Sequence, residues 1–140
     1  MNNQTIDYKF AGFWLRVIAG IIDTLILWIP ASLFNWLFKE SFSNEILFQV
    51  YDFIQLTIIW SLYYGFLESS TYQGTLGKRL LGLKAVDING NRISFVRAVS
   101  RFLLGIIASF PLGIGIFMIG FTKKKQGLHD ILAKCLVVKK

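Results

Sequence analysis

Hydrophobic residues occur along this chain in long runs that are separated by short polar segments. The first run extends from residue 12 to residue 38 and the second from residue 46 to residue 67. Roughly 20 residues of α-helix are enough to cross the ~30 Å hydrocarbon core of a bilayer. The pattern therefore predicts two membrane-spanning helices, over about 13–38 and 46–67, joined by the polar turn KESFSNE.

Two charged residues interrupt the first run, and they share one side of the predicted helix. Asp23 follows Arg16 by seven residues, which places it within about 20° of the same face and about 10.5 Å further along. A carboxylate near the middle of a bilayer costs roughly 2.5 to 3.5 kcal/mol, so it needs a partner or a wet cavity. Asp23 is therefore the leading candidate for an ion- or proton-binding residue. Arg16 either tunes this carboxylate or lies at the membrane rim and fixes the depth of the helix.

The second run carries a polar stripe of its own. Gln49, Asp52 and Gln55 recur every three residues, so they lie on one side of the helix and are expected to face the first helix or another subunit. Asp52 is either a further ion-binding residue or a carboxylate near the outer interface. Glu68, which closes the run, is expected to be a solvated end charge.

Positive charge gathers in the segment from residue 69 to residue 101, where six Lys and Arg residues accompany one acidic residue, Asp87. Short loops rich in Lys and Arg are retained in the cytoplasm, so this loop and the N-terminus are predicted to be cytoplasmic. Within the loop, Asn89 and Gly90 favour a type I′ turn between two short apolar segments. We expect a small cytoplasmic β-hairpin over about 82–95.

A third hydrophobic run, over about 97–121, contains the sequence FPLGIG at its centre. As one straight span it would place the lysines at 123–125 on the outer side, against the charge rule. A break between Pro111 and Gly115 gives instead two short helices that enter the bilayer and return, with both basic flanks inside. We favour this re-entrant or helical-hairpin arrangement over the single span.

The C-terminal segment, 126–138, has apolar residues at helical spacing and is predicted to be an amphipathic tail that ends in a Val137-Val138 strand able to pair with the hairpin. His129 and Asp130 are adjacent near its start. His129 is a candidate for proton transfer near neutral pH, and a capping or surface role for the pair is the alternative. One His and one Cys do not supply the ligands of a zinc site, so no metal site is expected.

Composition restricts the class of protein further. Of the 140 residues, 54% are hydrophobic and 16% are charged, which indicates a single membrane domain, 1–140, of the all-α class, surrounded by lipid. The net charge of +7 is explained by loop retention and attraction to anionic lipid, so no nucleic acid is expected as a partner. No cofactor is expected, and no enzyme activity, because no nucleophile, base and orienting group form a recognisable arrangement.

Three ordered segments carry a specific resemblance. GFWLRVIAGIIDTLIL, TLGKRLLGLKAVDINGNRISFVRAVSRF and PLGIGIFMIGFTKKKQGLHDILAKCLVV resemble the successive blocks of the bacterial RDD family, which is named for one arginine and two aspartates. By this resemblance Arg16 is the family arginine and Asp23 the first aspartate. The second aspartate is Asp130 of the GLHD block, with Asp87 as the alternative.

The resemblance implies a small protein of the bacterial cytoplasmic (inner) membrane. The family is suspected of transport, and some members are described as exchanging sodium or other monovalent cations for protons. Our leading hypothesis is a cation/proton exchanger that works as a homo-oligomer, since about three spans enclose little volume. The competing hypothesis is a membrane scaffold or accessory subunit in which Arg16, Asp23 and Asp130 form a structural ion-pair network.

Overall fold

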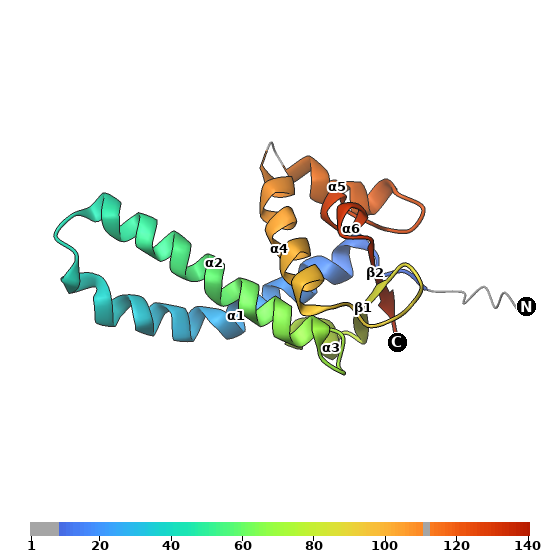
Figure 1. Ribbon diagram of the computed structural model, residues 1–140, viewed down its shortest axis with the longest axis horizontal. Coiled ribbons are helices and arrows are strands. Elements are labelled where there is room, and N and C mark those ends of the chain that lie inside the picture. The colour runs from blue at the N-terminus through green and yellow to red at the C-terminus, as the bar shows by residue number, and fades with distance from the viewer. Residues whose placement is uncertain (1–8, 111–112) are drawn as a thin grey trace, which may run out of the picture.

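The computed structural model describes residues 9–110 and 113–140, which are mainly helical. Two long helices form the arms of a hairpin, and the shorter elements gather at its base (Figure 1). In chain order the elements are α1 (Phe13–Phe38), the 3-10 turn η1 (Lys39–Ser41), α2 (Glu45–Ser69), α3 (Leu76–Leu80), β1 (Leu83–Asp87), α4 (Phe95–Ser109), α5 (Ile114–Phe121), α6 (Leu128–Leu132) and β2 (Cys135–Lys139). The predicted class, helical with a small sheet, is confirmed.

The hairpin arms α1 and α2 have the properties of membrane-spanning helices. They contain 26 and 25 residues, and they are the two helices of the described chain that are long and apolar enough to cross a bilayer unbroken. The side chain of Asn44 starts α2 by accepting hydrogen bonds from the amides of Ile46 and Leu47. Large apolar side chains such as Trp28 and Trp36 are exposed on the arms. A surface of this kind is stable against acyl chains rather than water.

Two of the three residues in the predicted polar stripe of α2, Asp52 and Gln55, face α1. The Asn35 side-chain amide donates to Asp52 Oδ1 at 2.5 Å, and Gln55 Nε2 donates to Asn35 Oδ1 at 3.3 Å. Gln49, the first member of the predicted stripe, is exposed. The hydrogen bonds of Asn35 therefore join the two arms well away from the base of the hairpin.

The third hydrophobic run is broken, as predicted. The axes of α4 and α5 differ by 104°, and the break includes residues 111 and 112, which lie outside the described residues. Phe95, at the start of α4, packs on Phe66 near the end of α2, with ring centroids 4.9 Å apart. Phe117 of α5 stacks on Phe13 at the start of α1, at 5.5 Å. Both helices of the bent pair therefore contact the base of the hairpin.

The small sheet differs from the predicted local hairpin. β1 pairs antiparallel with β2, from Leu83 opposite Lys139 to Asp87 opposite Cys135. The predicted pairing with the Val137-Val138 strand is thus confirmed, but the second hairpin strand expected within 82–95 is wrong, since residues 88–94 contain no strand.

Side-chain hydrogen bonds explain this difference. Asp87 Oδ1 accepts hydrogen bonds from the amides of Asn89 and Asn91, each at 2.8 Å, and Ser94 then caps α4 by accepting from the amide of Arg97. These bonds hold residues 88–94 in a turn and a helix start. The apolar segment CLVV of β2 therefore pairs with β1 in place of residues 88–94.

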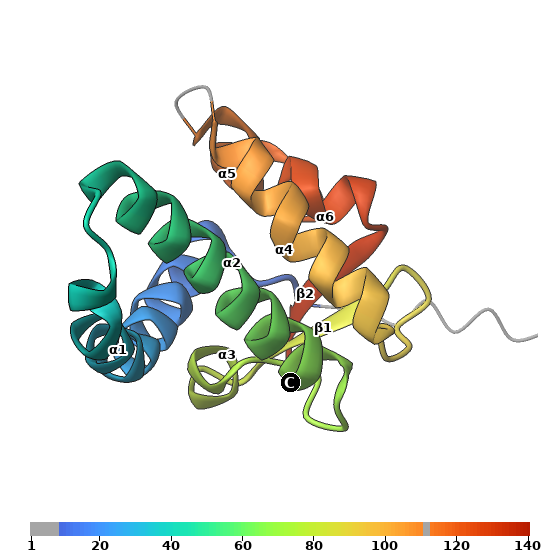
Figure 2. The same cartoon turned by 60° about the vertical axis from the view of Figure 1, so that its left-hand side comes forward.

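The two ends of the described chain lie together. Phe10 forms a β-bridge with Val138, and the amide of Ala11 donates to the carbonyl of Val137 at 2.9 Å. Figures 1 and 2 both show the strands beside α3, at the base of the hairpin. The start of α1 and the C-terminal strand are therefore on the same side of the molecule, as the sequence predicts.

Candidate functional site

Charged side chains from five helices meet at the base of the hairpin. We call this group the charge cluster; its members are Arg16 of α1, Glu68 of α2, Lys78 of α3, Arg101 of α4 and Asp130 of α6. Each of these side chains is more than nine-tenths buried. Charges buried to this extent are stable only when they are paired and hydrogen bonded.

Arg101 occupies the centre of the charge cluster. Its Nη1 donates to Asp130 Oδ1 at 2.9 Å, and its Nη2 donates to Glu68 Oε1. The planar guanidinium holds its donors in a fixed fork, so one side chain is able to bridge two carboxylates. The end of α2 is thereby tied to α6 through a residue of α4.

The two other cations complete the cluster from opposite sides. Arg16 Nη1 donates to Asp130 Oδ2, its Nη2 donates to the carbonyl of Lys125, and its Nε donates to the carbonyl of Ala11 at 3.2 Å. Lys78 Nζ donates to Glu68 Oε1. Each carboxylate therefore receives two cations, and α1 and α3 are joined to the same network.

The cluster keeps Asp130 ionised. Burial alone would raise the pKa of the Asp130 carboxyl, but Arg101 and Arg16 hold it well below its usual range. Burial, together with the nearby Arg101, lowers the pKa of the Lys78 amine, and Glu68 opposes this shift. Three cations and two carboxylates leave the cluster with one net positive charge. Asp130 is thus a fixed charge and not a proton carrier at physiological pH.

His129 lies beside the cluster as a neutral imidazole. Its Nε2 is 3.4 Å from Asp130 Oδ1. Burial lowers the pKa of His129 to about 4, because it outweighs the attraction of Asp130 for the protonated ring. The neighbouring Asp130 Oδ2 also accepts from the amide of Gly127 and so caps α6. These observations favour the structural alternative for the pair over proton transfer near neutral pH.

Asp23 forms a second, separate site. Its side chain is fully buried, and Oδ1 accepts hydrogen bonds from the Tyr63 hydroxyl and the Gly77 amide, both at 2.7 Å. No residue in the described parts of the chain donates to Oδ2 or forms an ion pair with this carboxylate. Asp23 is therefore a buried acid that the described residues bond through one oxygen, Oδ1.

The start of α3 docks closely on α1 at this second site. Thr75 caps α3, and the amide of Leu76 donates to the Tyr63 hydroxyl at 3.2 Å. A Cβ at Gly77 would lie 2.1 Å from the carbonyl oxygen of Ala19. Only glycine lets the two backbones approach this closely, and this approach is what brings the Gly77 amide to Asp23.

The structure groups the predicted site residues differently from the sequence. Arg16, His129 and Asp130 are brought together, whereas the partner of Arg16 is Asp130 and not Asp23. Asp52 belongs to neither site, since it bonds to Asn35 between the hairpin arms. The expectation that Glu68 is a solvated end charge is wrong: it is completely buried between Lys78 and Arg101.

Three members of the cluster were missed by the sequence reasoning. Lys78 and Arg101 were counted only as loop charges, and Glu68 only as a helix end. The excess of cations in the loop does not distinguish a buried lysine from a solvated one. A useful signal was available for Arg101, which lies on α4 one turn after Ala98 and directly before the apolar segment FLLGIIA.

The described residues offer no metal centre. Across 9–110 and 113–140, no three His, Cys, Asp or Glu side chains are placed to hold one ion. Cys135 is buried in the sheet, and burial raises the pKa of its thiol to about 11. The thiol is therefore neutral and poorly reactive.

Comparisons with known proteins agree with the resemblance seen in the sequence. The model of the RDD family matches residues 10–134. The chain is 36% identical to the uncharacterized protein YxaI of Bacillus subtilis, over 94% of this chain and 99% of that protein. It is 28% identical to the uncharacterized membrane protein YteJ of the same organism, over 96% of this chain and 84% of that protein. No solved structure matches the chain.

Loss of the central arginine is expected to destabilise the protein strongly. Arg101→Gln leaves Glu68 and Asp130 buried with only one cation each, and breaking a buried pair typically costs about 3–5 kcal/mol. Arg97→Gln is the matched control on the same helix, because Arg97 is exposed and lies 4.0 Å from Asp87. Thermal unfolding in detergent, followed by tryptophan fluorescence, compares the two. An equal loss of thermal stability in the two variants would show that Arg101 is not a central contact.

Stability is expected to fall as the pH is lowered below neutral. His129 has an ordinary pKa near 6.5 when unfolded and about 4 when folded, so the folded protein binds this proton more weakly. Its contribution is complete above pH 6.5 and is lost as the pH falls towards 4, by up to roughly 3 kcal/mol. The chain has one His, so His129→Gln removes this titration entirely. An unfolding midpoint that depends on pH in the same way in both proteins would contradict the assignment.

Proposed function

Because the chain belongs to the RDD family and buries an unpaired carboxylate in its first spanning helix, we propose that it is a small membrane transporter that exchanges a monovalent cation for a proton. It is a membrane protein of that family, as its two long apolar helices and its likeness to YteJ indicate. Asp23 is the residue at which the proton and the cation compete.

The proposal rests on the difference in hydrogen bonding between the two carboxylate oxygens of Asp23. Oδ1 is held by Tyr63 and Gly77, whereas Oδ2 has no donor in the described chain. Asp23 lies ten residues after the start of α1, about 15 Å along the helix. A buried carboxylate at such a depth is stabilised by a proton or by a small cation, and the two exclude each other at one oxygen.

The charge cluster has a different part in this proposal. Asp130 is held ionised by two arginines, so it does not exchange protons, and Arg16 is engaged with Asp130 instead of tuning Asp23. The cluster fixes the base of α1 and α2, and the Tyr63 hydroxyl and α3 then set the environment of Asp23. The exchange site is thereby separated from the structural charges.

Transport by this chain requires more than one copy. Two spanning helices and one bent pair enclose little volume, so a path across the bilayer is built by a homo-oligomer. We infer that the base of the hairpin, with the start of α1 and the C-terminal strand, faces the cytoplasm at a bacterial inner membrane, and the basic segments near that base support this orientation.

A membrane scaffold or accessory subunit is the second candidate, and one observation favours it. Asp23 Oδ1 holds the first turn of α3 against α1, at a glycine that has no room for a Cβ. In that function Asp23 is an acceptor that docks α3, and the charge cluster is a structural ion-pair network.

Ion flux into proteoliposomes tests the proposal. We expect an imposed pH gradient to drive uptake of Na⁺ or K⁺ by the purified protein, and Asp23→Asn to lower the initial rate at least tenfold. The asparagine keeps an acceptor oxygen for Tyr63 and Gly77 but removes the charge, so the fold is retained. Glu45→Gln, an exposed acid at the start of α2, is the control and should leave the rate unchanged.

Two results would contradict exchange at Asp23. One is the absence of cation movement driven by pH in the wild-type protein; the other is an undiminished rate in Asp23→Asn. If Asp23→Asn instead lowers the unfolding midpoint and the wild-type protein carries no flux, the scaffold function is supported.

A further inference from the structure

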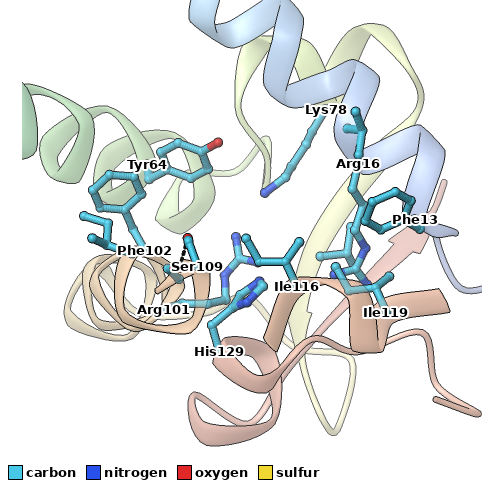
Figure 3. A pocket seen from close by; sticks show the side chains of 14 residues that line it. Phe13, Arg16, Tyr64, Lys78, Arg101, Phe102, Ser109, Ile116, Ile119 and His129 are labelled. Atoms are coloured by element: carbon cyan, nitrogen blue, oxygen red, sulfur yellow. Dashed lines mark hydrogen bonds between the residues drawn. The ribbon is translucent and has the colours of Figure 1, made fainter. Parts of the chain in front are cut away.

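A cavity of about 300 Å³ lies beside the charge cluster and is not used in the proposed exchange. It is formed between α1, α4 and α5, and Lys78 of α3 and His129 of α6 also contribute to its walls (Figure 3). Its volume is at the lower end of the range of about 300–1,000 Å³ found for small-molecule sites. The cavity is therefore large enough for a ligand group.

The cavity is lined by the cations of the cluster and not by its carboxylates. Arg16, Lys78 and Arg101 contribute to the wall, whereas Glu68 and Asp130 are not among the lining residues. Figure 3 shows the ends of Lys78 and Arg101 directed towards the same space. Because the cluster as a whole carries one net positive charge, the electrostatic character of this wall suits an anion.

Hydrogen-bond donors remain unused at the same wall. Arg101 is 5% exposed, and its Nε has no acceptor in the chain as described. Lys78 Nζ has three donors, and within 9–110 and 113–140 it makes one hydrogen bond, to Glu68. Buried donors without acceptors are costly, so the wall is completed by a ligand that accepts hydrogen bonds.

The remaining walls are apolar, and they extend away from the charges. Arg101, Gly105 and Ser109 line the cavity from successive turns of α4, which corresponds to about 12 Å of helix. The side chains that face this stretch are mainly hydrophobic: Phe13, Val17, Phe102, Ile106, Ile116 and Ile119. The cavity thus has a cationic end at the base of the hairpin and an apolar end towards the tip of the bent pair.

We propose that this cavity binds an anionic phospholipid. The phosphate accepts hydrogen bonds from Lys78 and Arg101, and the glycerol and first acyl carbons pack along α4 and α5, from which the chains continue into the bilayer. One monoanionic headgroup neutralises the net charge of the cluster. The orientation of the cavity also fits a lipid in a leaflet. Its cationic end, where the headgroup would lie, is on the side of the basic segments, and its apolar end points away from them, along α4.

Other ligands fit the cavity less well. A small inorganic anion would satisfy the cationic end but would leave the apolar walls in contact with water. A zwitterionic lipid would fill the apolar walls but would bring its own positive charge to a wall of cations. The anionic headgroup with attached acyl chains is the ligand that matches both ends.

The proposal is tested by filling the cavity without touching the ion pairs. A Cβ at Gly105 would meet only His129 Cγ, at 3.9 Å, so Gly105→Leu is tolerated by the helix and projects into the cavity. Gly120→Leu is the matched control, because Gly120 lies on α5 with nothing within 4 Å of the added Cβ. Both proteins are purified, stripped of lipid in detergent and titrated with phosphatidylglycerol, phosphatidylcholine or inorganic phosphate.

Native mass spectrometry and the unfolding midpoint provide the readouts. We expect wild-type protein and Gly120→Leu to bind one phosphatidylglycerol at least tenfold more tightly than phosphatidylcholine, with a rise of several degrees in midpoint. Gly105→Leu should lose both effects. Ile116→Phe narrows the cavity from α5 and is the second test if Gly105→Leu does not fold.

Three outcomes would overturn this proposal. They are unchanged binding of phosphatidylglycerol in the cavity-filling variant, equal affinity for phosphatidylcholine, and an equal rise in midpoint with inorganic phosphate alone. None of them depends on ion flux, so a failure here is distinguishable from a failure of the exchange function.

Discussion

The bridging of two buried carboxylates by Arg101 is the interaction on which the rest of the structure depends. Glu68 and Asp130 come from helices that are far apart in the sequence, and neither is stable in the interior without a cation. Arg101 pairs with both, and Arg16 and Lys78 then bring α1 and α3 to the same point. Because burying any one of these charges without its partners is costly, the ion pairs are stable only when all five helices are in place.

This arrangement separates three chemical environments that lie close together. The charge cluster holds fixed charges, and Asp130 within it stays ionised. Asp23 accepts hydrogen bonds from a hydroxyl and a backbone amide through Oδ1, and among the described residues none donates to Oδ2. The cavity is bordered by the cations of the charge cluster, whose hydrogen-bond donors are not all used by the carboxylates. The proposed exchange, the structural ion pairs and the proposed lipid binding thus involve different groups of residues.

Features that follow from a local pattern were predictable from the sequence. The first helix has the predicted bounds, since a long apolar run determines a span, and the break near Pro111 follows from a proline and glycines within an apolar run. The burial of Asp23 follows from its position in that run.

The charge partners were not predictable, because the choice between Asp23 and Asp130 for Arg16 depends on where α6 packs. The pairing of β1 with the Val137-Val138 strand was predicted, whereas the second hairpin strand predicted within 82–95 was wrong, because the side chain of Asp87 turns the chain there.

A double-mutant cycle between Arg16 and Asp130 tests the buried network most directly. The two residues are 114 positions apart in the chain, so any coupling between them reports on the folded arrangement. Arg16→Gln, Asp130→Asn and the double variant are unfolded in detergent and their free energies compared. We predict a coupling of about 1–3 kcal/mol, with the double variant losing far less than the sum of the single losses. Losses that add to within about 0.5 kcal/mol would contradict the network and the account of the protein built on it.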